Sequence, residues 1–564
     1  METNFSRRGF LKGAGVTALG TAALGLAACS GTEAPQAEPL GSTGAPQTAK
    51  NMPEAWDFEA DIIVVGSGGA GLAAGIAGRQ GNSSVILLEV SPEEECGGNT
   101  RVSGNIIMVP DSVEKGVTYQ TNLNGGYIVD PDIVHTWSQG LVDNLPWLTD
   151  LGYEMVFAKF ASPEFPSVEG GDGIKTYIVN PATGMKTWDA LYEAAEDAGV
   201  EMHFGTRATD LVYDTLTNEV FGVIADGASY KANKGVVLAC GGFENNPAMV
   251  RDYFPNTGCS QSFFFGCPYN VGDGFKMVMD IGADLWHMNA FAGGGVGLRI
   301  QSAESGLASL PAFKTKEFIY VDGEGNRFMY EETADHNRHG KVKERGVWPL
   351  ITVPDNSHVI LGQGLVDAGP VVDPTGFGIG WSNVHPSYIG ATDNDGFMNL
   401  GILVKGDTIE ELAEKLGYNP ATLAATIEEY NADAARGTDG KFHRGEEVLD
   451  DYFFDAGASS VGYGEGASQV SIEAFDLVPI EGPFYALDLS YGMLNSQGGP
   501  RKTVNGEVLD TKGSAIPRLY AAGEFGAPYP YMYNGGGNVS DAIASGRIAG
   551  THCATLTGWD GAEA

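Results

Sequence analysis

The chain has 564 residues, and its 33 Lys and Arg against 72 Asp and Glu give a formal net charge of −39 at pH 7. Such a surface repels a polyanion, so the charge argues strongly against a nucleic-acid binder. Hydrophobic residues make up 43% and charged residues 19% of the chain. This composition is typical of an ordered globular protein, and the length corresponds to about two to four domains.

The first part of the chain has the pattern of an export signal. Ser6–Lys12 contains two adjacent arginines, and an uncharged run of small and apolar residues, Gly13–Ala28, follows and ends at Cys29. This run is short for a membrane-spanning helix. It closely resembles a twin-arginine signal with a bacterial lipobox, which implies a signal peptide at 1–28 and a lipid on Cys29. We expect a flexible tether at 29–56 and a location outside the cytoplasm, either periplasmic or lipid-anchored to the cell membrane.

Neither the cysteines nor the histidines form a recognisable redox or metal motif. The six cysteines include no C-x-x-C pair, so no attached c-type haem and no ferredoxin-type cluster is encoded. Cys259 and Cys267 could form a disulfide, although isolated packed thiols are the favoured interpretation. The nine histidines show no H-E-x-x-H or comparable spacing, so no metal site is expected. Electrons for a redox reaction would come from an external donor.

A strand, a glycine-rich loop and a helix near the start of the chain predict a dinucleotide site. Asp61–Val65 is predicted to be a buried parallel strand, and it leads into the loop 66–71, G-S-G-G-A-G, and a helical run of small residues. In such a loop one glycine makes the turn, one admits the pyrophosphate, and one lets helix and strand pack closely. A second apolar strand, Val85–Leu88, ends at Glu89, whose carboxylate would accept hydrogen bonds from a ribose.

Four later glycine-rich segments favour a flavin over a nicotinamide. They are 97–105, which follows the second strand, 236–243, which joins a strand to a double glycine, and 519–524 and 535–541 near the C-terminus. With these segments the chain resembles the flavoprotein family of soluble fumarate reductases, urocanate reductases and 3-ketosteroid dehydrogenases. The resemblance runs from about Asp57 to Cys553.

The resemblance implies that both ends of the chain bind FAD. The last glycine-rich segment opens a helix whose amide groups would face the flavin carbonyl and stabilise negative charge on the reduced ring. Asp273 matches a family motif near the cofactor, and Ala208 would lie beside the adenine. With the loop and Glu89 included, the predicted FAD-binding residues are Gly66, Gly68, Ala70, Gly71, Glu89, Asn99, Thr100, Ser103, Gly104, Asn105, Ala208, Asp273, Glu524, Gly537, Asn538, Val539 and Ser540.

The expected fold class is α/β, with a Rossmann-like FAD-binding domain in two parts, 57–287 and 495–564. These parts enclose an inserted α+β capping domain at 288–494, which by the resemblance would close over the flavin. Within it, 319–331 predicts a strand, a turn and a strand. Two helices are expected after the capping residues Asp407 and Asn419.

The cations with which fumarate reductases of this family hold a dicarboxylate are missing. The position of the proton-donating arginine is Asp335, and the clamp arginine before the late glycines is Asn534. One histidine position falls at Gly294, and the histidines before the late double glycine are replaced by 494–497, L-N-S-Q. Unpaired carboxylates would lose several kcal/mol on desolvation, so fumarate is disfavoured. Arg338, from the next turn, is the remaining candidate cation.

Aromatic residues stand where the clamp would be. Tyr529, Tyr531 and Tyr533 cluster just before the late glycines, in a loop that also contains two prolines. Ketosteroid dehydrogenases have a tyrosine in a similar Tyr-x-Gly-x-Gly loop, so Tyr533 is a candidate proton donor or carbonyl-polarising group. Tyr330 and Asp335 are the other catalytic candidates. The alternative is that the tyrosine rings pack a domain interface.

These observations predict an exported FAD-dependent oxidoreductase of CH–CH groups, acting on a carbon-carbon double bond conjugated to a carbonyl. Reduction of a low-charge enone of steroid, lactone or phenolic type is favoured, because export suits anaerobic respiration with external acceptors. One alternative is a reductase of an unsaturated monocarboxylate, of enoate or urocanate type. Another is a flavoprotein electron carrier without catalysis, and a nicotinamide-dependent dehydrogenase is a weaker third. The expected partners are a small-molecule substrate and a membrane or cell-surface redox protein as electron donor, with no nucleic acid and with membrane contact only through the lipid.

Overall fold

The fold is known from a computed structural model, which forms one compact unit over residues 46–564. The residues that it describes are 49–158, 163–165, 168–254, 263–264, 266–299, 308–309, 313, 315–331, 337–338, 341–342, 353–372, 379–385, 390–444 and 477–559. The predicted signal peptide and most of the tether lie outside them, as do Asp335 and Cys259. No helix within these ranges is both long enough and apolar enough to cross a bilayer.

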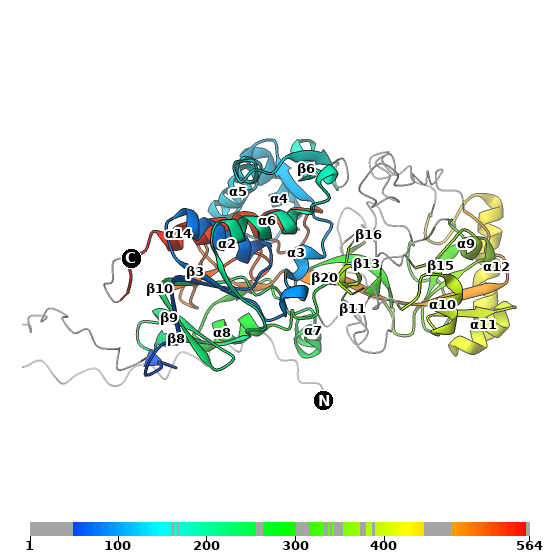
Figure 1. Cartoon of the computed structure of the whole chain (residues 1–564). Coiled ribbons are helices and arrows are strands. Elements are labelled where there is room, and N and C mark those ends of the chain that lie inside the picture. The colour runs from blue at the N-terminus through cyan, green and yellow to red at the C-terminus, as the bar shows by residue number, and fades with distance from the viewer. Residues whose placement is uncertain are drawn as a thin grey trace, which may run out of the picture. The chain divides into compact units, whose positions relative to one another are not determined.

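The larger part of the fold is built around a mixed sheet of parallel and antiparallel strands (Figure 1). Its strands are β1 (Ala49–Lys50), β2 (Phe58–Val65), β3 (Val85–Leu88), β7 (Glu201–His203), β8 (Ala208–Asp214), β9 (Val220–Ala225), β10 (Ala228–Leu238), β22 (Glu507–Leu509) and β23 (Ala515–Ala521). The second half of β10 pairs in parallel with β2 on one side and with β23 on the other, and β3 and β7 continue the parallel order beyond β2. The predicted apolar strands therefore lie side by side, because each is buried on both faces.

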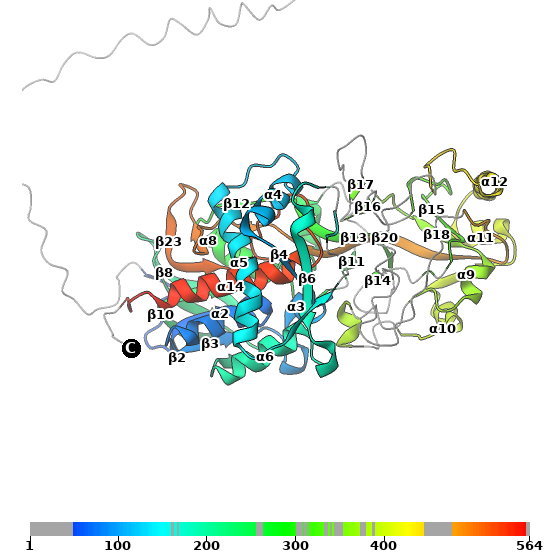
Figure 2. The same cartoon turned by 90° about the horizontal axis from the view of Figure 1, so that it is seen from above.

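Two helices from opposite ends of the chain lie together on this sheet. Helix α2 (Gly69–Gln80) follows β2, and α14 (Gly537–Ala554) is the last helix in the described ranges. Figures 1 and 2 both show α14 beside α2. The contact is close because small residues face each other, with Gly546 against the backbone of Ala70 and Gly550 against that of Ala74. This contact brings the late glycine-rich segment to the early one.

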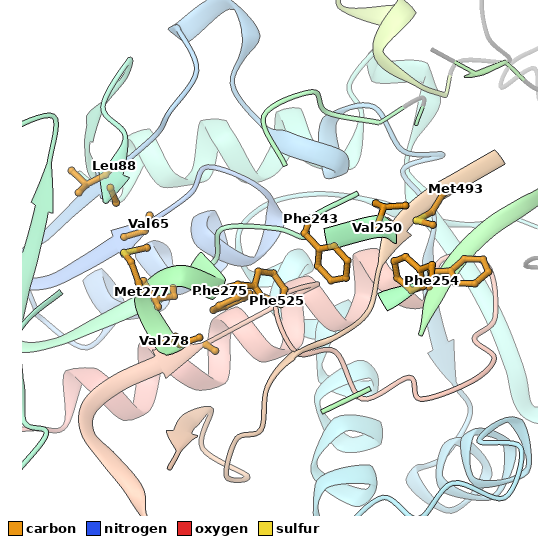
Figure 3. Packing of buried hydrophobic residues seen from close by; sticks show 14 of the residues in the cluster. Val65, Leu88, Phe243, Val250, Phe254, Phe275, Met277, Val278, Met493 and Phe525 are labelled. Atoms are coloured by element: carbon orange, nitrogen blue, oxygen red, sulfur yellow. The ribbon is translucent and has the colours of Figure 1, made fainter. Parts of the chain in front are cut away.

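Further helices and a small antiparallel sheet complete this part of the fold. The helices are η1 (Glu93–Glu95), α3 (Gly98–Arg101), α4 (Val113–Leu123), α5 (Pro131–Asp150), η2 (Gly171–Gly173), η3 (Pro181–Thr183), α6 (Thr187–Asp197), α7 (Pro247–Tyr253) and α8 (Asp273–Asp280), and the sheet is β4 (Ile107–Pro110), β6 (Ile174–Val179) and β5 (Met155–Ala158). A hydrophobic core of this part contains a row of phenylalanines (Figure 3): Phe243 stacks on Phe254 and meets Phe275 edge to face, and Phe275 meets Phe525 in the same way.

A second sheet is built mainly from the part of the chain predicted as the capping domain, 288–494, but it also includes β11 from before that part. Its strands are β11 (Phe263–Phe264), β13 (Phe291–Arg299), β14 (Ala308–Ser309), β15 (Phe318–Val321), β18 (His358–Leu361), β19 (Leu403–Gly406) and the long β20 (Phe484–Ser496). Other elements of residues 288–494 are α9 (Gln363–Asp367), η5 (Trp381–Asn383), α10 (Asn394–Asn399), α11 (Ile409–Leu416), α12 (Pro420–Arg436) and the pair β16 (Asn337–Arg338) with β17 (Lys341–Val342). The pair β12 (Leu285–Trp286) with β21 (Gly499–Pro500) lies just outside this range at both ends. The predicted α/β fold class, with a Rossmann-like domain and a second α+β part, is confirmed. The boundaries at 287/288 and 494/495 stay predictions.

Two local predictions in this part were wrong. The expected strand after the turn near residue 325 does not form, and only a single bridge joins Val321 to Arg327. The N-cap of α11 is Thr408, whose hydroxyl accepts a hydrogen bond from the Glu411 amide, and not Asp407. The predicted cap Asn419 is confirmed at the start of α12.

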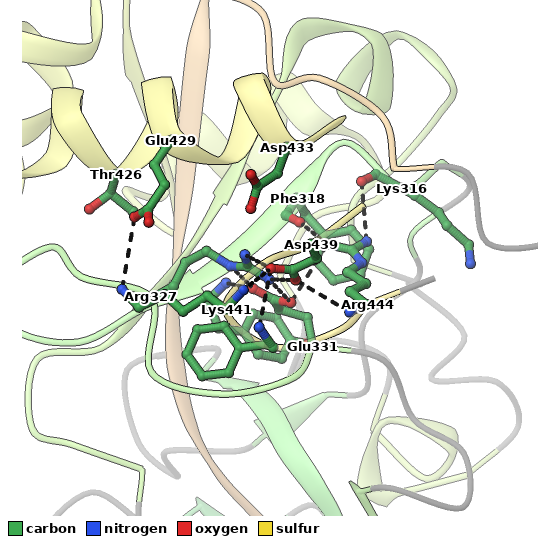
Figure 4. A network of polar contacts seen from close by, with 12 residues as sticks. Lys316, Phe318, Arg327, Glu331, Thr426, Glu429, Asp433, Asp439, Lys441 and Arg444 are labelled. Atoms are coloured by element: carbon green, nitrogen blue, oxygen red, sulfur yellow. Dashed lines mark hydrogen bonds and ion pairs between the residues drawn. The ribbon is translucent and has the colours of Figure 1, made fainter. Parts of the chain in front are cut away.

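A buried ion-pair network fixes the segment that was predicted as the second strand (Figure 4). The Arg327 guanidinium donates to both carboxylate oxygens of Glu331, at 2.7 and 2.8 Å, and to both of Asp439, at 3.2 and 2.8 Å. Arg444 lies 3.8 Å from Glu331 and donates to the backbone carbonyls of Phe318 and Lys316. Two cations and two anions balance, so these side chains are buried without net charge.

Asp439→Asn should destabilise the protein, because it leaves the buried Arg327 with one anionic partner. A hydrogen bond to a charged group contributes about 1.5 to 3 kcal/mol, and we expect a loss of that size in the free energy of unfolding. Urea unfolding measures it. Asp172→Asn is the matched control, since Asp172 forms an exposed ion pair with Lys115 and its removal should change little. Equal effects of the two variants would contradict the role of the network.

Candidate functional site

The loop between β2 and α2 has the shape that a dinucleotide pyrophosphate requires. Gly66 has φ +106°, and a Cβ at Gly71 would lie 1.8 Å from the Gly66 carbonyl oxygen, so neither position accepts a side chain. At Gly68 the nearest atoms to an added Cβ are 3.9 Å away, which leaves the backbone open on that side. Gly68 is also the N-cap of α2 and offers no capping side chain. An open backbone at a helix N-terminus suits a phosphate group.

Glu89 lies at the end of β3 and is held in place from both sides. One carboxylate oxygen accepts hydrogen bonds from the Ser67 amide, at 2.8 Å, and from the Ser67 hydroxyl. The other accepts from the amide and hydroxyl of Ser91, at 2.8 and 2.9 Å. The side chain is buried, so its orientation is fixed. These four donors use the four acceptor sites of the carboxylate, so a ribose hydroxyl would have to replace one of the serine hydroxyls, and ribose binding by Glu89 stays a prediction.

The segment 97–105 is tied to the same loop. The Thr100 hydroxyl accepts a hydrogen bond from the Gly69 amide at 3.0 Å, and the Ser103 hydroxyl donates to the Thr100 carbonyl at 2.8 Å. Asn105, with φ +56°, donates from its side chain to the Ser103 carbonyl. Gly104 lies between them. The predicted residues of this segment therefore form one turn against the N-terminus of α2.

The late glycine-rich segment lies at the start of α14 against the residues that follow this turn, Ile106 and Met108. The N-cap Gly536 provides no capping side chain, so the first amides of α14 have no such partner. The Ser540 hydroxyl accepts a hydrogen bond from the Met108 amide at 2.6 Å, and Asn538 exchanges side-chain hydrogen bonds with Asn495 and Gln497. An uncapped helix N-terminus favours negative charge, such as that on a reduced flavin.

The predicted adenine side lies at the edge of the sheet. Ala208 is the first residue of β8 and is buried. The preceding residue, Arg207, forms an ion pair with Asp273 at the start of α8. Burial raises the pKa of Asp273, and Arg207 opposes this effect. The structure thus brings Ala208 and Asp273 to one place through Arg207, and their roles in FAD binding stay predictions.

A pair of buried carboxylates, Glu244 and Glu524, lies between the early and late segments. The Asn99 side-chain amide donates to Glu244 at 2.8 Å and to Glu524 at 3.0 Å, and Asn270 donates to Glu244 at 2.7 Å. The missing side chain of Gly242 makes the space, because an added Cβ would lie 2.2 Å from Glu524 Oε1 and 2.4 Å from Glu244 Oε2. Among the described residues, Glu524 Oε1 has no hydrogen-bond partner.

That buried acceptor is suited to a hydroxyl of the ribityl chain or ribose of FAD. With the open backbone at Gly68, the uncapped start of α14 and the fixed Glu89, the site fits an extended FAD molecule. Glu244 was missed by the sequence analysis. Its only signal was its place two residues after the double glycine of segment 236–243.

The carboxylate pair should make stability depend on pH. Burial, and for Glu524 also the charge of Glu244, raises the pKa of both carboxyl groups. A folded-state pKa above the unfolded value of about 4.3 means that stability is fully present below that value and is lost as pH rises toward the folded pKa. While one proton is lost, the slope reaches about 1.4 kcal/mol per pH unit.

Glu244→Gln removes one of the two charges, so the variant should lose less stability than the wild type as pH rises. The measurement is urea unfolding of the cofactor-free proteins across the range from about pH 5 to pH 8. Glu411→Gln, on the partly exposed face of α11, is the control and should follow the wild type. If the unfolding free energies of Glu244→Gln and the wild type change equally with pH, the raised pKa values of the carboxylate pair are not the cause of the pH dependence.

The three tyrosines of the aromatic loop, which we define as residues 527–534, make different contacts. The Tyr529 hydroxyl donates to the Gly537 carbonyl at 2.8 Å and accepts from Trp137 Nε1 at 3.0 Å, so Tyr529 is buried with both hydrogen bonds made inside the protein. The Tyr531 ring stacks on Tyr127, with 6.1 Å between centroids. The Tyr533 ring is buried at the start of α14, where a Cβ at Gly537 would approach its Cδ2 to 3.3 Å.

Asn534, at the position of the missing clamp arginine, makes its hydrogen bonds inside the protein. It is fully buried, and its carbonyl oxygen accepts hydrogen bonds from the Tyr119 hydroxyl at 2.8 Å and the Glu164 amide at 2.8 Å. Glu164 in turn accepts a hydrogen bond from the Gly535 amide. The side chain therefore supports the loop and cannot reach a substrate carboxylate.

The structure locates only some of the other residues that were considered for substrate binding or catalysis. Tyr330 is half-buried beside Glu331 of the ion-pair network, while Asp335 lies outside the described residues. For Arg338 and Gly294 the structure describes backbone alone, in β16 and β13. Leu494 packs against the cluster that contains Tyr533 and Met532. The catalytic residues Tyr533, Tyr330 and Asp335 stay predictions.

A buried cation that the sequence analysis missed contacts the aromatic loop. Lys341, in β17, is 3% exposed, and its Nζ lies 5.0 Å from the Tyr531 ring centroid and 5.1 Å from that of Phe291. Burial lowers the pKa of Lys341 to about 7. The sequence does not distinguish Lys341 as a buried cation, because Lys343 and Arg345 follow it closely and the three together look like an ordinary basic surface segment.

Comparison with known proteins identifies the family. Residues 61–539 match the family described as FAD binding domain. A 3-oxosteroid 1-dehydrogenase of Mycobacterium tuberculosis is 26% identical over 599 residues, which cover 89% of this chain and 99% of that protein. A urocanate reductase of Eggerthella lenta is 26% identical over 531 residues, covering 89% of this chain and 76% of that protein.

A solved structure shares the fold. The crystal structure of a 3-ketosteroid Δ1-dehydrogenase from Sterolibacterium denitrificans, in complex with 1,4-androstadiene-3,17-dione, matches with a TM-score of 0.66 and 20% identity, over 88% of this chain and 99% of that one. The family match covers most of the chain and includes both glycine-rich ends of the site. The chain therefore belongs to the FAD binding domain family and is an FAD-dependent oxidoreductase, with relatives named as dehydrogenases and reductases.

Proposed function

We propose that the protein is an exported reductase that acts on a carbon-carbon double bond conjugated to a carbonyl, in a low-charge enone of steroid, lactone or phenolic type. The observation that carries this proposal is the position of Asn534, which supports the loop from within and leaves no cation there for a second carboxylate. The relatives named for steroids and urocanate also support a substrate with a conjugated double bond.

Bound FAD supplies the hydride for this reaction. The buried rings of the aromatic loop keep water from the site, and hydride at the β-carbon of an enone moves the electron pair of the double bond to the carbonyl oxygen. The Tyr533 hydroxyl would then give a proton to the α-carbon and recover one from solvent. In a dry pocket each of these interactions is stronger than in water.

A second candidate substrate is an unsaturated monocarboxylate. The observation that favours it is Lys341, a buried ammonium group against the aromatic loop. One cation can pair with one carboxylate, whereas a dicarboxylate would need a second. Fumarate therefore stays disfavoured.

The paired arginines at the start of the chain and the small apolar run behind them support export, with Cys29 as the lipid-bearing residue. A membrane or cell-surface redox protein would then reduce the flavin, because the cysteines lack the spacing of a haem or cluster relay. Acylation of Cys29 can be checked by mass spectrometry of the membrane-associated protein.

The test is anaerobic stopped-flow absorbance. The purified holoprotein is reduced with dithionite, and flavin reoxidation is followed after mixing with steroid enones, benzylideneacetone, cinnamate, urocanate and fumarate. Rapid reoxidation by a neutral enone supports the proposal, and rapid reoxidation by cinnamate or urocanate alone favours the monocarboxylate. Rapid turnover of fumarate would contradict the argument from Asn534, and reoxidation by dyes alone would indicate an electron carrier.

A further inference from the structure

The carboxyl groups of Glu244 and Glu524 share a donor on one side and face each other on the other side. The Asn99 side-chain amide donates to Glu244 Oε1 at 2.8 Å and to Glu524 Oε2 at 3.0 Å. The two remaining oxygens, Glu244 Oε2 and Glu524 Oε1, lie 2.4 and 2.2 Å from the point where a Cβ on Gly242 would be. Among the described residues, Glu524 Oε1 has no donor while both groups are ionised. One proton between these two oxygens supplies the missing hydrogen bond, because a protonated carboxyl group donates.

The groups packed around the pair offer hydrogen bonds but no positive charge that compensates the two acids. Asn270 donates to the pair at 2.7 Å, and the Ser496 amide and hydroxyl lie 3.5 and 3.4 Å from it. Burial raises the pKa of the Cys240 and Cys267 thiols, and the charge of Glu89 adds to this effect, so both thiols stay protonated. No described lysine, arginine or histidine is a main influence on the pKa of either carboxyl group. Two adjacent carboxyl groups in such a place do not both ionise, so the pair holds one proton.

The pair lies between the two glycine-rich ends of the cofactor site. On one side, Asn99 is followed by Thr100, whose hydroxyl contacts the Gly69 amide in the pyrophosphate loop. On the other side, Ser496 is preceded by Asn495, which accepts a hydrogen bond from the first turn of α14. A negative charge that the cofactor gains is therefore added to the same buried region as the pair. In such a region charges interact more strongly than in water.

We propose that the Glu244–Glu524 pair is a proton-binding site linked to the cofactor: it holds one proton when FAD is oxidised and binds a second when FAD is reduced. An added negative charge favours the neutral form of a nearby acid, which gives the direction of this change. By reciprocity, a proton on the pair favours the reduced cofactor. The site needs no cavity, because a proton is held at the contact between two oxygen atoms.

Electrons and protons balance over the two half-reactions. The external donor supplies two electrons, one proton enters the flavin with them, and the pair takes the second proton from solvent. When the substrate removes a hydride, which carries two electrons and one proton, the pair releases its second proton and keeps the first. Reduction of a double bond consumes two electrons and two protons in total. The pair would thus hold the second proton inside the protein until the substrate arrives.

The first test is the pH dependence of the midpoint potential of the purified holoprotein. A tenfold change in proton concentration shifts a two-electron couple by about 30 mV for each linked proton. The slope of the wild type should therefore approach about 59 mV per pH unit, twice that of the double variant Glu244→Gln with Glu524→Gln. The two glutamines keep the size of the side chains and can hydrogen-bond to each other, but they bind no proton in this range.

Asp541→Asn is the matched control. Asp541 is also buried, in α14, and burial raises its pKa to about 6, so it is the rival site for a linked proton. The variant should keep the slope of the wild type. A slope that falls in Asp541→Asn and not in the double variant would place the linked proton on Asp541 and overturn the inference.

A second measurement needs no variant and decides the question even if the double variant does not retain FAD. Infrared difference spectra of the wild-type holoprotein distinguish a protonated carboxyl group from a carboxylate. Reduction of the flavin should add the signal of one protonated carboxyl group, and this signal should shift in D2O. No added signal, or a slope of one proton per two electrons at every pH, would overturn the inference.

The inference goes beyond the proposed function, because it depends on bound FAD and on no particular substrate. A wild type with two linked protons that reduces no compound of the panel would refute the proposed function and keep the inference. A wild type that reduces enones with a single linked proton would do the reverse.

Discussion

Tyr533→Phe should lower the rate of flavin reoxidation by an enone by about 100- to 10,000-fold, the usual contribution of a general acid. The substitution removes one hydroxyl and keeps the ring that packs at the start of α14, so FAD content should stay unchanged. Reduction of the flavin by dithionite does not involve the proton donor and should be as fast as in the wild type. Anaerobic stopped-flow absorbance measures both half-reactions separately.

The control for this variant is Tyr418→Phe. The Tyr418 hydroxyl donates to the Asn356 carbonyl at 2.6 Å, next to α11 and outside the aromatic loop. Its loss should reduce stability by about 1 kcal/mol without slowing reoxidation. Should Tyr533→Phe reoxidise as fast as this control, the proton would come from another group, with Tyr330 the next candidate.

Gly71→Ala and Gly68→Ala should separate folding from cofactor binding. A Cβ at Gly71 would lie 1.8 Å from the Gly66 carbonyl oxygen, so Gly71→Ala must displace the turn between β2 and α2. Forced overpacking of this kind costs about 1 to 3 kcal/mol or more, and we expect both lower thermal stability and loss of bound FAD.

In Gly68→Ala the new methyl group enters open space, 3.9 Å from its nearest neighbours. The cofactor-free variant should therefore be as stable as the wild type. The methyl group would occupy the space into which the pyrophosphate must come, so FAD affinity should fall at least about tenfold, or 1.4 kcal/mol. Thermal unfolding of the cofactor-free proteins and titration with FAD check the pair. Unchanged FAD affinity in Gly68→Ala would show that the phosphates bind elsewhere.

Local patterns were sufficient for the elements that bind the cofactor. The apolar run at Asp61–Val65, the glycine loop and Val85–Leu88 predicted β2, α2 and β3, because each element is specified by its own residues and buried on both faces. The α/β class and the FAD-binding family followed from the order of these motifs. The second strand expected after residue 325 did not form, since Arg327 and Glu331 are held by the buried ion-pair network with Asp439, which is distant in the sequence.

By itself the sequence determined the fold class, the cofactor family and the absence of an arginine at position 534. Only the tertiary structure decided what these residues contact. Asn534 became a support of the loop through Tyr119 and Glu164. Glu244 and Glu524 met as a buried carboxylate pair, and Lys341 was placed against Tyr531. Each of these contacts joins segments that are far apart in the chain. Burial and charge pairing across such contacts depend on packing between elements, which local residue patterns do not encode.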